Sequence, residues 1–146
     1  MRHICLAVVF GLIFSTSAYA SKECKSTTLT PFSLGAKVGS QGSVVKRTSH
    51  GRFEFKAERT GDSAVRMRFK LGGREMANTP FELMRPEAKA CFSEKLQQVG
   101  HKKGHFHCYV LGEPWCDKTP HGYCYAMACC DLPGGGSVCD GGQAPF

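Results

Sequence analysis

The stretch that decides the fold is residues 51–71, GRFEFKAERTGDSAVRMRFKL. Apolar and charged residues alternate in Gly51–Ala57 and again in Ala64–Leu71, with a period of two that is typical of strands with one buried face. Between them, Glu58–Ser63 has the composition of a turn. We therefore expect a β-hairpin with an apolar inner face and a charged outer face made of Arg52, Glu54, Lys56, Arg66, Arg68 and Lys70.

Further elements flank this hairpin. Thr27–Leu34 and Gly42–Thr48 have strand-like composition, and His105–Leu111 alternates again. Pro86 suits the first position of a helix whose apolar residues continue at helical spacing to Val99. The sequence predicts an α+β fold: a small antiparallel sheet, one helix packed on it, and a disulfide-rich, loop-dominated C-terminal extension.

The first twenty residues have the pattern of a secretory signal peptide. A short basic start is followed by the apolar run Ile4–Phe14 and by Ala18-Tyr19-Ala20, a small-x-small cleavage pattern. This apolar run is about half the ~20 residues that a spanning helix needs. We expect residues 1–20 to be removed and residues 21–146 to form a single secreted domain, extracellular or periplasmic, with a basic part (21–103) and a cysteine-rich tail (104–146).

The cysteines support export. Nine are present, and cleavage after Ala20 would remove Cys5 and leave an even number. An even count in an exported chain predicts a disulfide framework with no free thiol, and the Cys-x-x-Cys pair that is common in zinc sites is missing here. The pairing stays open at this point. The expected disulfide residues are Cys24, Cys91, Cys108, Cys116, Cys124, Cys129, Cys130 and Cys139.

Charge and aromatic residues divide the chain in the same way. Residues 21–103 hold 17 Lys and Arg against 8 Asp and Glu, whereas residues 104–146 hold one Lys against four acids. Such asymmetry indicates two surfaces with different partners. The basic surface would attract an anionic partner, whether carbohydrate, membrane or nucleic acid, through Arg52, Arg66, Arg68 and Lys70.

The tail holds every Tyr and Trp that follows the signal peptide, and these residue types are enriched in binding sites. The alternative is that they cover disulfides. We expect the tail to contact an extracellular partner through Tyr109, Trp115, Tyr123 and Tyr125.

Two histidines form a candidate metal pair. His105 and His107 are two residues apart and share one face of the expected strand, so both imidazoles can reach one ion. The alternative is a pair of solvated surface histidines.

No catalytic or cofactor motif is present, and we expect no cofactor. The sequence favours a secreted binding protein, resembling an effector, inhibitor or toxin in style, that acts by contact. The alternative is a small cationic hydrolase of polyanions, in the manner of small ribonucleases, with acid–base and phosphate-binding groups drawn from His50, Glu54, Glu58, Arg66, Arg68 and His107.

Overall fold

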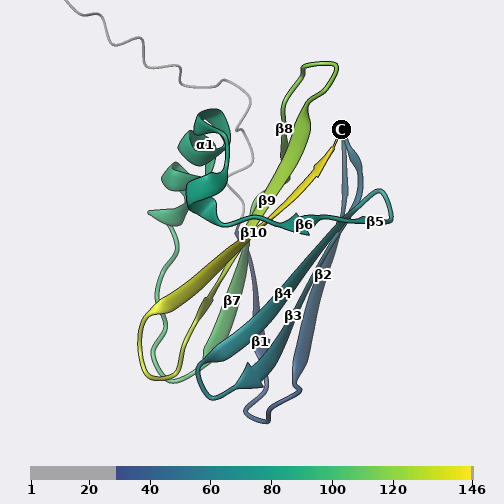
Figure 1. The fold of residues 1–146 in the computed structure, drawn as a ribbon. Helices are drawn as coiled ribbons and strands as arrows, with labels where there is room; N and C mark the ends of the chain where they lie inside the picture. Colours follow the sequence, from purple (N-terminus) through teal and green to yellow (C-terminus); the bar gives the residue numbers. More distant parts are fainter. Residues whose placement is uncertain (1–28, 146) are drawn as a thin grey trace, which may run out of the picture.

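The computed structural model describes residues 29–145, and the predicted signal peptide and Cys24 lie outside the described residues. Two antiparallel sheets and one helix make up this part of the chain (Figure 1). In chain order the elements are β1 (Leu29–Leu34), β2 (Gln41–Thr48), β3 (Gly51–Gly61), β4 (Ala64–Leu71), β5 (Arg74–Glu75), β6 (Ala77–Asn78), the 3-10 helix η1 (Phe81–Leu83), α1 (Pro86–Leu96), β7 (Phe106–Leu111), β8 (Trp115–Cys116), β9 (Tyr123–Asp131) and β10 (Ser137–Pro145).

The expected hairpin is confirmed as β3 and β4, at the centre of a four-stranded sheet ordered β2-β3-β4-β5, here called sheet B. Phe53, Phe55 and Phe69 are fully buried on its inner face, as the alternation predicts. The connection is tighter than expected, because β3 continues through Gly61. Gly72 and Gly73 close the next hairpin with φ of 58° and 79°, a left-handed conformation that glycine adopts at little cost.

The second sheet, here called sheet A, is built mainly from the tail. Its strands run in the order β1-β7-β9-β10-β6, with β8 also paired to β9. The expectation of a loop-dominated extension is therefore wrong for residues 106–145, most of which lie in β7, β8, β9 and β10. Strand β9 has no polar face because it is central, and eight of its nine residues are buried.

Sheets A and B pack face to face, and the helix covers the other side of sheet A. One apolar cluster lies between the sheets and includes Phe55, Phe69, Phe106 and Ala126. A second cluster joins Ala88 and Phe92 of α1 to the outer face of sheet A. The predicted helix is confirmed, with Pro86 at its start. It packs on sheet A, however, and not on the sheet that contains the β3–β4 hairpin (Figure 1).

Two glycines that resemble loop residues in the sequence lie inside β10 instead. A Cβ at Gly142 would come within 2.8 Å of the Cβ of Phe69, and a Cβ at Gly141 would come within 2.8 Å of the carbonyl oxygen of Thr79. These glycines are needed because sheet B and the segment after β6 approach β10 closely.

Three disulfides join residues directly opposite each other on adjacent strands of sheet A: Cys108–Cys130, Cys116–Cys124 and Cys129–Cys139. The first two face the core between the sheets, whereas Cys129 faces the helix side. Cys91 is also disulfide-bonded. Since the other six described cysteines pair with one another, the partner of Cys91 is not among the described residues.

Within residues 29–145, no helix is both long enough and apolar enough to cross a membrane.

Candidate functional site

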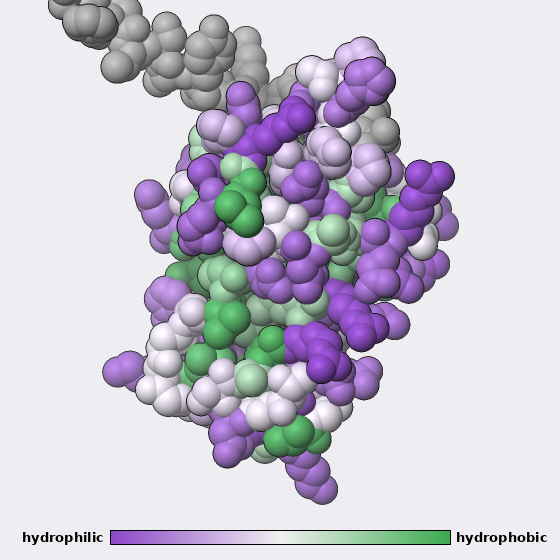
Figure 2. Space-filling view, in the orientation of Figure 1, coloured by the Kyte–Doolittle hydropathy of each residue, from purple (hydrophilic) through white to green (hydrophobic). Residues whose placement is uncertain are grey.

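The outer face of sheet B carries most of the exposed positive charge of the β-structure, and we call it the basic face. Register places alternate residues of β2, β3, β4 and β5 on this side of the sheet. Hydrophilic surface lies over β3 and β4 in Figure 2. Its cations are Arg47, Arg52, Lys56, Arg66, Arg68 and Lys70, and its acids are Glu54, Glu58 and Glu75.

Two cross-strand pairs of β3 and β4 bring opposite charges together on this face. Glu58 lies opposite Arg66, and Glu54 lies opposite Lys70. Glu54 also forms an ion pair with Arg52 on its own strand, with 2.8 Å between Nε and Oε1. The acids therefore neutralise part of the face but not all of it.

Two cross-strand pairs bring like charges together. Lys56 lies directly opposite Arg68, and Arg47 lies directly opposite Arg52. The four positions predicted from the sequence thus lie on one face, which also holds Arg47 and Lys56. Alternation placed Lys56 on this face already, but the register that sets it against Arg68 required the structure.

The predicted aromatic surface is largely buried. Tyr109 and Tyr125 are only 6% and 1% exposed, because their rings lie in the cluster beneath α1. Their assignment to a binding surface is therefore corrected to a packing role. Trp115 and Tyr123 are partly buried at the edge of this cluster, where the Arg85 guanidinium lies 5.6 Å from the centre of the Tyr123 ring.

A polar row crosses the outer face of sheet A beyond the helix. Ser33, His107, Asp131 and Ser137 lie directly opposite one another on β1, β7, β9 and β10. Asp131 is 1% exposed. Its carboxylate accepts hydrogen bonds from Ser137 Oγ and from the backbone N–H of Lys102, and it lies 2.9 Å from Nδ1 of His101.

This row does not have the geometry of a catalytic triad. Ser137 Oγ lies 2.8 Å from Nδ1 of His101, the same ring nitrogen that contacts Asp131. A serine nucleophile and its orienting carboxylate must occupy opposite ring nitrogens of the histidine. The row instead ties the loop that contains His101 to β9 and β10. Sequence reasoning missed it because Asp131 and Ser137 become neighbours only through strand register.

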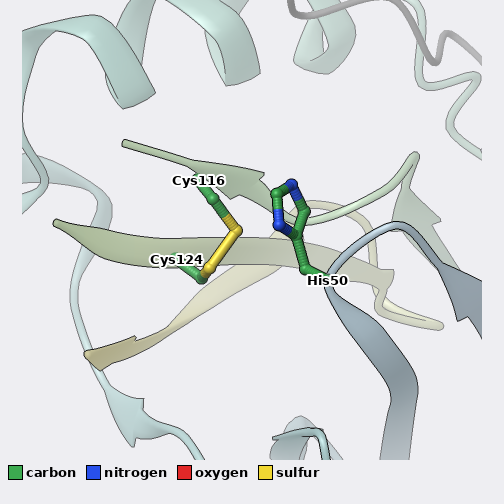
Figure 3. A group of neighbouring side chains, drawn as sticks. All are labelled: His50, Cys116 and Cys124. Atoms are coloured by element: carbon green, nitrogen blue, oxygen red, sulfur yellow. A yellow bond between two sulfur atoms is a disulfide. The ribbon is translucent and has the colours of Figure 1, made fainter. Parts of the chain in front are cut away.

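The histidines predicted as a metal pair do not converge with a third ligand. His105 is exposed, and Nδ1 of His107 lies 3.0 Å from Ser33 Oγ. Among the described residues, the only group of three His, Cys, Asp or Glu side chains with ligand atoms within 4.8 Å of one another is His50, Cys116 and Cys124 (Figure 3).

That group is not arranged as a metal site in its oxidised form. Cys116 and Cys124 are bonded to each other, so neither sulfur is a thiolate, the form that binds metal. Figure 3 shows the imidazole of His50, which comes from the β2–β3 turn, lying beside this bridge. The group therefore connects the turn of sheet B to the β8–β9 hairpin of sheet A.

The residues considered for hydrolysis are separated by the fold. Glu54, Glu58, Arg66 and Arg68 lie on the outer face of sheet B. His107 lies on the outer face of sheet A, on the opposite side of the sandwich. No single substrate group can therefore contact both the basic face and His107.

Two groups of the polar row give the folded state a defined pH dependence. Burial raises the pKa of Asp131, but hydrogen bonds with His101, the Lys102 N–H and Ser137 outweigh burial and hold the pKa below its usual value. Burial, followed by the positive charge of Lys102, lowers the pKa of His107. In both cases the unfolded chain binds more protons than the folded one, so stability rises with pH.

We expect the urea concentration at the midpoint of unfolding to fall in two stages as the pH is lowered. The first begins below the ordinary histidine pKa of about 6.5 and reports His107, and the second begins near pH 4 and reports Asp131. Asp140, whose pKa is raised by burial, opposes the second stage. Urea titrations at pH 7.5, 5.5 and 3.5 measure both stages. The Asp131→Asn variant should lose only the second, and a midpoint that does not change with pH would rule this linkage out.

Comparison of the chain with protein-family models, with curated proteins and with solved structures finds no match. The functional argument therefore depends on the geometry of the basic face.

Proposed function

We propose that this protein is an exported binding protein that holds an anionic ligand by contact with the basic face. Export is supported by the signal-like first twenty residues and by the disulfides of sheet A. Binding by contact is supported by the separation of His107 from the basic face, which leaves acid–base catalysis there with less support than simple binding.

The observation that carries the proposal is the pairing of like charges. Lys56 faces Arg68 and Arg47 faces Arg52 at directly opposed positions of sheet B. Like charges at such positions destabilise a sheet. An anion placed between two such cations removes this repulsion and gains two attractions. Because the strands fix the spacing of the backbone positions that carry the cations, only the side chains need to be ordered when the ligand arrives.

The composition of the face indicates how the ligand is recognised. Its apolar residue is Val45, which is 52% exposed, and none of its described residues is aromatic. Proteins that bind single-stranded nucleic acid usually stack bases on aromatic side chains. The basic face therefore favours ligands recognised by charge alone, such as a sulfated polysaccharide or an anionic surface.

We expect a Lys56→Ser/Arg68→Ser variant to bind heparin roughly tenfold more weakly than the wild-type protein. Each cation that contacts the polyanion adds about one to the slope of log affinity against log salt, so the slope should fall by about two. The same variant should be as stable as the wild type or slightly more so, because a repulsive pair is removed. Calorimetric titration across several salt concentrations and urea unfolding measure these quantities.

The matched control is Lys89→Ser/Lys103→Ser, which removes the same charge from α1 and from the loop before β7. Its heparin affinity and salt slope should change much less than those of Lys56→Ser/Arg68→Ser. Equal losses in the two variants would show that net charge, and not the basic face, governs binding. Parallel titrations with single-stranded DNA and with phosphatidylserine vesicles distinguish the kinds of anion.

A further inference from the structure

The outer edge of β4 is unpaired over most of its length. Strand β4 spans Ala64–Leu71, but β5 pairs only with Lys70 and Leu71. After β5 the chain leaves sheet B, and β6 pairs with β10 of sheet A. Within the described residues, no strand is paired with the edge from Ala64 to Arg68.

The direction of the backbone groups along this edge follows from the neighbouring hydrogen bonds. The carbonyl oxygen of Phe69 accepts from the N–H of Met76, so the groups of Phe69 point away from β3. In an antiparallel strand every second residue points the same way. Val65 and Met67 therefore direct their N–H and C=O groups outward at the free edge.

A shallow hollow of about 620 Å³ runs beside this edge. It is lined by Arg66, Met67, Arg68 and the segment 75–78. Close by, the first residues of β4 and β10 diverge (Figure 1), and in this opening Val65 and Val138 are only partly buried against the core. Figure 2 shows hydrophobic surface in this opening between β10 and β4.

We propose that the free edge of β4 binds an extended acidic peptide segment of a partner protein as an added strand. The outward N–H and C=O groups of Val65 and Met67 pair with its backbone. Since side chains alternate along a strand, its acidic residues lie on the side of Arg66 and Arg68, and its apolar residues lie over the opening beside Val65. The inference rests in part on the proposed function, because the two arginines belong to the basic face.

Charge decides between an acidic partner and a second copy of this chain. Pairing of two β4 edges would bring Arg66 and Arg68 against the same residues of the other copy. Such like-charge contacts are a common means of preventing edge-to-edge association. The edge therefore favours pairing with an acidic strand and disfavours pairing with the β4 edge of a second copy. The full chain should remain monomeric in sedimentation experiments.

The probe is the peptide acetyl-Thr-Glu-Val-Glu-Val-Glu-Thr-amide, added to isotope-labelled full-length protein without its signal peptide. At roughly ten times its Kd, the peptide should slow hydrogen exchange of the Val65 and Met67 amides about tenfold. The amides of Arg66 and Arg68, which already pair with β3, should change much less. A peptide of the same composition whose glutamates are consecutive should bind much more weakly.

Two variants make the test specific. Val65→Pro removes one outward N–H and should weaken peptide binding about tenfold, whereas Val65→Ala keeps the N–H and serves as its control. Arg66→Glu/Arg68→Glu should reverse the preference, so that a peptide with lysine in place of glutamate binds better. This reversal keeps the proposal testable if the proline variant does not fold.

The result that would overturn the proposal is peptide binding without protection of Val65 and Met67, or no binding at all. Dimerisation of the free protein through β4 would also overturn it. Heparin titration of the wild-type protein without peptide is a separate measurement. The proposal of strand addition can thus be wrong while heparin binding persists. The proposed binding at the basic face can likewise be wrong while the peptide protects the amides of the β4 edge.

Discussion

Replacing Phe55 with alanine should lower the free energy of unfolding by about 3–5 kcal/mol. Phe55 is fully buried between the two sheets, and its ring centre lies 5.1 Å from that of Phe69 and 5.5 Å from that of Phe32. Phe32 belongs to β1 of sheet A, so the substitution removes contacts within sheet B and between the sheets, and it leaves a cavity. Urea unfolding with the disulfides intact measures the loss.

The control is Val45→Ala, on the outer face of the neighbouring strand. Val45 is 52% exposed, and its truncation should change stability by no more than about 0.5 kcal/mol. A loss below about 1 kcal/mol for Phe55→Ala would contradict the position of the core between the two sheets.

Removing the Cys108–Cys130 bridge in a Cys108→Ala/Cys130→Ala variant should cost about 3 kcal/mol or more. The bridge spans 22 residues, and restriction of the unfolded chain by a loop of this length is worth roughly 3 kcal/mol. Both cysteines are also fully buried, so the variant loses their packing as well. Thermal and urea unfolding of the oxidised proteins give the difference.

The Cys129→Ala/Cys139→Ala variant is the comparison. Its bridge spans only 10 residues, and Cys139 is exposed, so its removal should cost less. If loss of the Cys129–Cys139 bridge were the more damaging, neither loop length nor burial would explain how the disulfides stabilise this fold.

Much of sheet B could be predicted from the sequence. The β3–β4 hairpin buries one face and exposes the other, and that arrangement produces period-two alternation in the chain. The helix could be found because Pro86 and the helical spacing of Ala88 and Phe92 are local signals. Five of the six cations of the basic face followed from the same alternation, and Arg47 did not.

Sheet A was harder to predict for two physical reasons. Strand β9 is covered on both faces, so its apolar run has no alternation to distinguish it. Gly141 and Gly142 resemble loop residues, although they lie in β10 where neighbouring atoms leave no room for a Cβ. Burial of Tyr109 and Tyr125 depends on where α1 packs, and no local pattern specifies that position.

The candidate sites depend on register, which is a property of strand pairs. Sequence alternation places Lys56 and Arg68 on one face, but only pairing shows that they are directly opposite. The free edge of β4 is likewise a consequence of the shortness of β5 and of the departure of the chain to sheet A.

The placement of the three bridges has a consequence for oxidative folding. Cys129 and Cys130 are neighbours in the chain but face opposite sides of β9, so each can reach only partners on its own side of the sheet. A slip of one residue in register would exchange the two sides and separate every correct pair. The native disulfides can therefore form only when the strands are paired in the native register. Once formed, each disulfide prevents a change of register until it is reduced.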